Sequence, residues 1–125
     1  MADTPDMTVV WTEIPVRDID RGIAFYGDVF KFEMARDDTG PNPMANFTSN
    51  MQSISGHIYP GEPAAGGNGP TIHFNVPDTL EATAERCWKA GGSVLGDPIT
   101  IPPGRFQYAT DPDGNSIGLF EMKAA

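Results

Sequence analysis

The segment Asp111–Glu121, which reads DPDGNSIGLFE, follows an aromatic segment at Arg105–Thr110. Pro112 restricts one backbone dihedral of the turn, and Gly114 accepts a positive φ that a side chain would resist. Beyond the turn, strand-forming residues favour a returning strand, with Ile117, Leu119 and Phe120 as its apolar members. The sequence therefore predicts a β-hairpin whose second strand is Ser116–Met122.

Length and composition predict a single domain in the cytoplasm. The chain has 125 residues, of which 39% are hydrophobic, and this is enough to bury a core. No apolar run approaches the roughly 20 residues that span a bilayer, and the first residues lack the basic and apolar regions of a signal peptide. Cys87 is the one cysteine, which excludes an intrachain disulfide and a thiolate metal cluster. We expect a cytoplasmic location and no membrane partner.

The charge pattern argues against nucleic acid as a partner. The formal net charge is −9, and the eight Lys and Arg residues are scattered along the chain. Such a surface repels phosphate backbones. Acidic charge also keeps a small protein in solution, and it is compatible with a cationic ligand without requiring one.

The first half of the chain predicts a strand, a helix and three strands. Asp18 stands where a helix N-cap is expected, and apolar residues recur at helical spacing from Ile19 onward. The expected strands are Val9–Val16, Phe32–Ala35, Ala45–Ser49 and Ser53–Tyr59.

The second half repeats this order after a linker at Pro60–Pro70, which is rich in Gly and Pro. Asp78 and Glu81 form a capping pattern for a helix that ends at Gly91–Gly92. Its apolar face is expected to comprise Leu80, Ala84, Cys87 and Trp88. The expected strands are Thr71–Val76, Val94–Leu95, Phe106–Thr110 and Ser116–Met122.

The two halves can be aligned residue by residue, which indicates an internal repeat. The pairs at one constant offset are Trp11 with Thr71, Glu13 with His73, Val16 with Val76 and Asp18 with Asp78. Gly56 falls on Gly118 at nearly the same offset.

With this repeat, the segments WTEIPVRDIDRGIAFYGDVF and DPDGNSIGLFE resemble the vicinal oxygen chelate superfamily, which includes glyoxalases, bleomycin-resistance proteins and extradiol dioxygenases. The resemblance covers Val9–Met122. It implies an α+β fold of two tandem βαβββ modules whose curved mixed sheets enclose a concave cleft. It implies one glyoxalase-like domain, with module one at 9–59, the linker at 60–70 and module two at 71–122. It also implies a homodimer and a small organic ligand.

The residues at the family's metal positions differ from those of metal-binding relatives. Carried over by position, Trp11 and Thr71 replace two His ligands, and Gly118 replaces a Glu, with Gly56 as its counterpart in module one. None of these binds a divalent ion well, so we expect no metal cofactor. The alternative is a metal-dependent lyase, isomerase or dioxygenase that holds Zn, Ni, Mn or Fe at a displaced site around Glu13 and His73.

Strand alternation gives the candidate ligand-binding residues. Glu13 and His73 are expected to share the concave surface, either as an acid–base pair or as a structural pair that satisfies itself. If they touch, the carboxylate raises the pKa of His73. The aromatic residues form a stacking wall or plain core, while His57 is expected to face away from the cleft. The predicted ligand-binding set is Trp11, Glu13, Phe47, Thr71, His73, Asn75, Tyr108 and Phe120. Whether a reaction is catalysed stays open.

Overall fold

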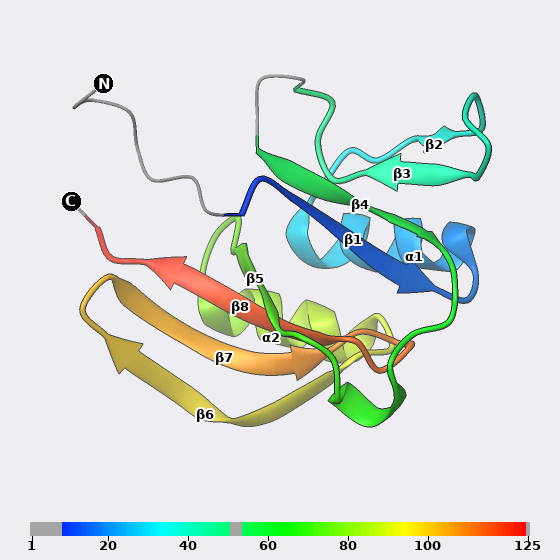
Figure 1. The fold of residues 1–125 in the computed structure, drawn as a ribbon. Coiled ribbons are helices and arrows are strands. Elements are labelled where there is room, and N and C mark those ends of the chain that lie inside the picture. The colour runs from blue at the N-terminus through cyan, green and yellow to red at the C-terminus, as the bar shows by residue number, and fades with distance from the viewer. Residues whose placement is uncertain (1–8, 51–53, 125) are drawn as a thin grey trace.

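The structure is a computed structural model that describes residues 9–50 and 54–124 (Figure 1). Each half has the predicted order of one strand, one helix and three strands. The first half comprises β1 (Trp11–Val16), α1 (Ile19–Phe30), β2 (Arg36–Asp37), β3 (Met44–Asn46) and β4 (Ser55–Pro60). The second comprises β5 (Ile72–Asn75), α2 (Leu80–Lys89), β6 (Ser93–Ile101), β7 (Gly104–Thr110) and β8 (Ser116–Met122). The expected strand start at Ser53 lies outside the described residues.

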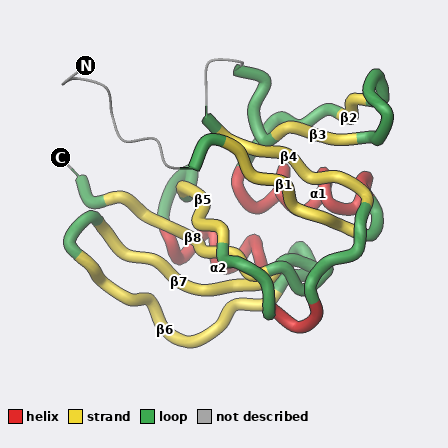
Figure 2. Tube along the Cα trace, viewed as in Figure 1, coloured by secondary structure: helices red, strands yellow, loops and turns green. Residues whose placement is uncertain are grey.

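The strands form two mixed sheets with the same topology. The first sheet has the order β1-β4-β3-β2 and the second has the order β5-β8-β7-β6. The pairs β1–β4 and β5–β8 are parallel, and the other pairs are antiparallel. Figure 2 shows the two sheets as separate layers that do not close on one another. The predicted α+β class and the repeated βαβββ unit are confirmed.

Each sheet has an inner face that contributes to one shared core and an outer face that does not. On the inner faces, residues such as Ile14, Ile58, Phe74 and Leu119 are buried in a single cluster that spans both halves. The helix α1 contacts β2, β3 and β4, while α2 contacts β6, β7 and β8, and the two helices contact each other. Because side chains alternate along a strand, the neighbouring residues of each strand form the outer faces.

A polar bridge joins the two halves at the predicted hairpin turn. Asp111 is only 2% exposed, and its Oδ2 accepts a hydrogen bond of 2.8 Å from the Tyr26 hydroxyl on α1. Asn115 donates through Nδ2 to the Pro15 carbonyl of β1 at 2.8 Å. Burial, with the Asp111 carboxylate beside it, raises the pKa of Tyr26, so that the hydroxyl stays protonated as a donor. The turn therefore fixes how one half lies on the other.

Local signals at the turn and at the first helix are confirmed. Gly114 adopts a φ of 87°, which the turn requires. The Asp18 side chain caps α1 by accepting hydrogen bonds from the backbone N–H groups of Asp20 and Arg21. Both features are determined by a few consecutive residues and do not depend on distant ones.

Three expectations for individual elements were wrong. Phe32–Ala35 is not a strand, because Phe32 leaves the sheet and packs between Phe30, Phe47 and Phe74. The N-cap of α2 is Thr79, whose Oγ1 accepts from the Ala82 N–H at 3.1 Å.

Asp78 pairs with Arg86 instead of capping the helix, and these hydrogen bonds lower its pKa to about 2. Trp88 is 69% exposed and does not belong to the buried face of α2.

Several strand boundaries also differ: β3 ends at Asn46 and not at Ser49, and β6 continues to Ile101 through a register shift between Leu95 and Ile99. The linker contains a single 3₁₀ turn at Ala65–Gly67. None of the helices in the described residues is long and apolar enough to cross a membrane.

Candidate functional site

The outer face of the first sheet carries a row of three side chains in contact, Trp11, His57 and Glu13. The Trp11 indole Nε1–H donates to His57 Nδ1 at 2.9 Å, and His57 Nε2 lies 3.5 Å from a Glu13 carboxylate oxygen. Because Nδ1 accepts this bond, the proton of the neutral ring is on Nε2, which faces the carboxylate. Both ring nitrogens of His57 are therefore occupied.

This arrangement corrects the prediction that His57 faces away. In the β1–β4 pair, His57 lies opposite Glu13, and Gly56 lies opposite Thr12. Gly56 faces inward, where an added Cβ would lie 2.3 Å from the Thr12 carbonyl oxygen. The counterpart of Gly118 in module one is therefore His57 and not Gly56, which reverses the predicted alternation of β4.

The outer face of the second sheet carries an aromatic cluster around His73, formed by His73, Phe106, Tyr108 and Phe120. The His73 ring is nearly perpendicular to Phe106 at a centroid distance of 5.0 Å and to Phe120 at 5.8 Å. Tyr108 completes the cluster at 6.1 Å and is 40% exposed. Phe106 is buried, yet it lies outside the shared core. These rings form one continuous apolar surface on one side of the sheet.

His73 has no hydrogen-bond partner among the described residues, in contrast to His57. Its ring lies over Gly118, where an added Cβ would be 2.0 Å from Nδ1. Burial lowers the pKa of His73, because the aromatic cluster withholds water from the charged form. The ring is thus a neutral polar group in an apolar setting.

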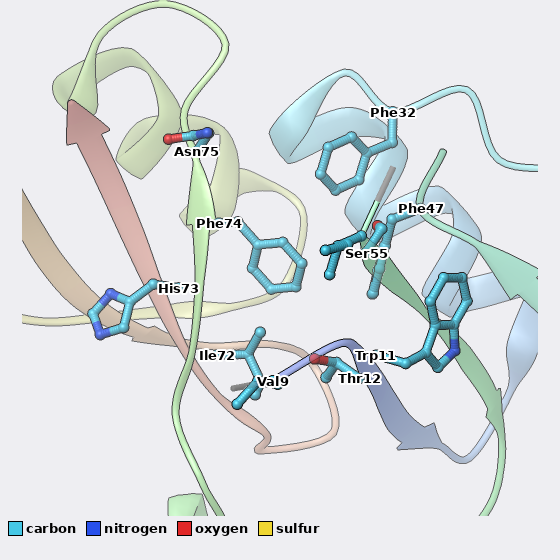
Figure 3. A pocket seen from close by; sticks show the side chains of 11 residues that line it. Val9, Trp11, Thr12, Phe32, Phe47, Ser55, Ile72, His73, Phe74 and Asn75 are labelled. Atoms are coloured by element: carbon cyan, nitrogen blue, oxygen red, sulfur yellow. The ribbon is translucent and has the colours of Figure 1, made fainter. Parts of the chain in front are cut away.

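The predicted Glu13–His73 pair does not form within the chain. Glu13 pairs with His57 instead, and His73 is surrounded by aromatic rings. Figure 3 shows Trp11 and His73 pointing to opposite sides of the space between the modules. The two outer faces are directed away from each other, so the expected rise in the pKa of His73 from Glu13 is also wrong.

A pocket of about 350 Å³ lies between the two modules. Phe32, Phe47, Ile72 and Phe74 point into it in Figure 3, whereas His73 lies at its edge and points away. Phe47 belongs to the buried core, so for this residue the core alternative of the sequence analysis holds. The pocket is apolar, and the polar groups that line it include Thr12 and Ser55.

A second, more open hollow of about 800 Å³ lies at the β6–β7 turn. Its lining includes Arg105, whose guanidinium is paired with both carboxylate oxygens of Glu81 at 2.7 Å and with Glu121. These hydrogen bonds raise the pKa of Arg105 and lower that of Glu81. The cluster joins α2 to the second sheet, and its groups are engaged with one another.

The residues present do not fit the metal site that the resemblance implies. The room for a side chain at position 118 is taken by the imidazole of His73. Glu13 and His57 give two adjacent ligands, while protein metal sites need three or more. Within residues 9–50 and 54–124, no group of three or more His, Cys, Asp or Glu side chains is placed to hold an ion.

The predicted ligand-binding residues are therefore divided between three places. His73, Tyr108 and Phe120 share the second outer face, together with Thr71, whose hydroxyl bonds Ser116 at 2.5 Å. Asn75 follows His73 by two positions on the same strand, Trp11 and Glu13 lie on the first outer face, and Phe47 lies in the core between the modules. Sequence reasoning missed His57, Phe106 and the space above Gly118. All three features depend on which residues of neighbouring strands lie opposite one another, and a single sequence does not give this register.

Comparison with known proteins relates the chain to a single family. Residues 8–119 match the family described as Glyoxalase/Bleomycin resistance protein/Dioxygenase superfamily. A "Glyoxylase-like domain-containing protein" from Didymella fabae is 33% identical over 119 residues, which cover 86% of this chain and 88% of that protein.

Solved structures agree on the fold. Fosfomycin resistance protein FosX from Mesorhizobium loti has a TM-score of 0.64 at 23% identity, covering 96% of this chain and 95% of that chain. TnmS3, an antibiotic binding protein from Streptomyces sp. CB03234, has a TM-score of 0.61 at 24% identity, covering 98% and 99%. At this level of identity the likeness concerns the fold alone.

Proposed function

Since this chain belongs to the Glyoxalase/Bleomycin resistance protein/Dioxygenase superfamily, we propose that it binds a planar aromatic small molecule on the outer face of its second sheet. The observation that carries the proposal is His73, a neutral ring without a hydrogen-bond partner inside a partly exposed aromatic cluster. An unpaired polar group in an apolar surface is the usual form of a specificity contact in a ligand site. The fold by itself does not choose between binding and catalysis.

The chemistry of this face favours a neutral or cationic aromatic ligand. Tyr108 and Phe120 are partly exposed, and buried Phe106 supports Phe120 from a nearly parallel position at 8°, so that a flat ring can pack on the exposed parts. The net charge of −9 disfavours an anion. His73 then offers one hydrogen bond to a polar substituent on that ring.

We further propose that a second copy of the chain covers the outer faces, giving a homodimer. The second outer face also carries Leu95, Ile99 and Met122, which are exposed apolar residues next to the aromatic cluster. A contiguous exposed apolar surface of this kind marks an interaction site. Because each chain has two outer faces directed apart, a two-fold axis can lay the first face of one copy on the second face of the other, twice. The concave cleft would then lie between two chains.

The site as proposed uses no metal. Because the residues at the family's metal positions are replaced, the remaining candidate ligands are Glu13 and His57 on one face and His73 on the other. The two ring nitrogens of His57 already face Trp11 and Glu13. Elemental analysis of protein purified without added metal is expected to find no stoichiometric Zn, Ni, Mn or Fe. One bound ion per chain, lost on replacing Glu13 or His57, would contradict this expectation and favour the metal-dependent lyase, isomerase or dioxygenase alternative.

Three matched probes test ligand binding, namely naphthalene, 2-naphthol and 2-naphthoate. They share one aromatic frame and differ in hydrogen bonding and charge. We expect 2-naphthol to bind more tightly than naphthalene and 2-naphthoate to bind most weakly. His73→Phe keeps an aromatic ring but removes both nitrogens. Since one hydrogen bond contributes about 1 kcal/mol, the variant is expected to bind 2-naphthol roughly three- to tenfold more weakly and naphthalene equally well.

Chemical-shift mapping by NMR decides where the probes bind. Shifts at His73, Tyr108 and Phe120 support the proposal. Shifts confined to Phe32, Phe47 and Phe74 would assign the ligand to the pocket between the modules and overturn it. If His73→Phe lowers the affinity for naphthalene and for 2-naphthol equally and also lowers stability, His73 only supports the fold.

A further inference from the structure

Gly118 occupies a strand position where its backbone does not require glycine. It lies in the interior of β8, opposite His73 in the parallel β5–β8 pair. It is not among the glycines with a positive φ, which include Gly114 in the preceding turn. A glycine inside a strand weakens it, and such a residue often marks a close approach of another group. Glycine is therefore required at position 118 because a neighbouring group leaves no room for a side chain, and not because of its backbone conformation.

The group that approaches Gly118 is the imidazole of His73. An ideal Cβ at position 118 would lie 2.0 Å from Nδ1 and 2.4 Å from Cε1 of the ring. Both distances are far below van der Waals contact. Any side chain at this position would displace the ring from β8.

Two aromatic residues flank the ring, which is itself exposed on the outer face. Phe106 and Phe120 stand edge-on to His73 at 88° and 86°. The three ring atoms nearest that Cβ are Nδ1, Cε1 and Cγ, so the ring lies over Gly118 and Nε2 is farther from the Cβ than these three. The two phenyl rings and the bare backbone together hold the ring in this place.

We propose that Gly118 is a positioning residue, whose missing side chain seats His73 against β8 so that Nε2 is presented to a ligand on the aromatic face. This rests on the proposed function, because it assigns Gly118 a role in the same site. The ligand class that this seat selects is a planar aromatic molecule with one hydrogen-bonding substituent near its edge. The glycine then acts on the ligand only through the orientation of His73.

The test is Gly118→Ala, which adds the single carbon that the ring excludes. The ring must leave its seat, so we expect the Hε1 signal of His73 to move and its pKa to rise toward the ordinary value as burial is lost. Affinity for 2-naphthol is expected to fall about three- to tenfold, as in His73→Phe, because the same hydrogen bond is lost. Gly40→Ala is the matched control, since a Cβ there has no neighbour closer than 3.9 Å.

A double-mutant cycle separates positioning from general destabilisation. In a His73→Ala background the space is empty, so Gly118→Ala is expected to change neither stability nor 2-naphthol affinity. Persistence of the full effect in that background would overturn the proposal, because the alanine would then act elsewhere.

The two proposals fail in different ways. If the Hε1 signal and the pKa of His73 are unchanged in Gly118→Ala, Gly118 does not position His73, whatever the affinity for the probes. A changed signal and pKa, in a protein whose wild type binds none of the probes on this face, would overturn the ligand function and with it the role of Gly118 in binding.

Discussion

The two outer faces use equivalent strand positions for opposite purposes. In the first module Glu13 lies opposite His57, and in the second His73 lies opposite Gly118. The side-chain partner in the first module engages Nε2 of the ring, while Trp11 engages Nδ1. The empty position in the second module leaves His73 without a hydrogen bond and surrounds it with aromatic rings.

This difference indicates which face is suited to a ligand. A histidine whose nitrogens both face partners within the protein must leave one of them to bind a ligand. A histidine held by shape alone keeps its hydrogen-bonding capacity. The repeat thus has one module whose outer face is internally satisfied and one whose outer face is not. Each prediction below removes one feature on which this comparison depends.

The largest effect is expected from Asp111→Ala, which removes the bridge that orients the two faces. The carboxylate accepts hydrogen bonds from the Tyr26 hydroxyl, from the backbone N–H groups of Asp113 and Asn115, and from the Asn115 amide. Since buried donors without acceptors each cost about 1–3 kcal/mol, we expect a loss of about 3 kcal/mol or more in the free energy of unfolding. Urea denaturation measures it.

Asp97→Ala is the matched control for this change, because Asp97 is exposed on β6. It is expected to alter stability by less than about 0.5 kcal/mol. A similar small change in Asp111→Ala would mean that the modules are held together by apolar packing alone.

The next effect concerns the second outer face as an interface. Leu95 is 49% exposed there, so Leu95→Glu does not disturb the core of the single chain. In the proposed homodimer this residue is covered, and a buried unpaired carboxylate is strongly unfavourable. Light scattering after gel filtration is expected to give twice 13.4 kDa for the wild type and 13.4 kDa for the variant.

Trp88→Glu serves as the control, because Trp88 is also exposed, at 69%, but lies on α2. It is expected to stay dimeric. A monomeric wild type would refute the homodimer, and a monomeric Trp88→Glu with a dimeric Leu95→Glu would move the interface to the helical side.

A smaller effect is expected from His57→Phe, which breaks the satisfied arrangement of the first module. The indole N–H of Trp11 loses its acceptor at 2.9 Å, which costs about 1 kcal/mol because water can partly replace it. The chain has two tryptophans, so a Trp88→Phe background makes Trp11 the only indole. Its fluorescence is expected to change with His57→Phe, and 2-naphthol affinity is expected to fall less than in His73→Phe, because His73 is the ring that offers the ligand a hydrogen bond. A loss of 2-naphthol affinity larger than in His73→Phe would contradict this assignment.

Features set by consecutive residues could be predicted from the sequence. The hairpin at Asp111–Glu121, the Asp18 cap and the order of elements depend on turn residues, caps and periodicity. The same local reasoning was wrong for the cap of α2, because Asp78 is held by Arg86 eight positions further on and Thr79 is left to cap. A contact across more than two helical turns competes with a local pattern in a way that the pattern does not reveal.

The candidate site could be predicted only in part, because it depends on how strands pair. The side chains of β5 were assigned to the correct faces, since alternation within one strand is sufficient for that. The faces of β4 were not, because its register was inferred from matching Gly56 with Gly118, and a shift of one residue reverses every side chain. The separation of Glu13 from His73 reflects the packing of two modules through their inner faces. That arrangement is set by the joint core around Phe74 and not by either strand.

The smallest effect, and the most direct test of the comparison, is the titration of His73. The chain has two histidines, so NMR resolves two Hε1 signals, and His57→Phe assigns them. Burial lowers the pKa of His73 in the folded state below its ordinary value of 6.5. Between these two values the unfolded chain binds the proton more readily than the folded chain does. The contribution of neutral His73 to stability is therefore complete above pH 6.5 and is lost as the pH falls through the folded-state pKa. In His73→Phe this part of the pH dependence is expected to disappear, and in the wild type 2-naphthol affinity is expected to change in the same pH window. A His73 midpoint at or above 6.5 would mean that the ring is hydrated or paired, and the distinction between the satisfied face and the open face would no longer hold.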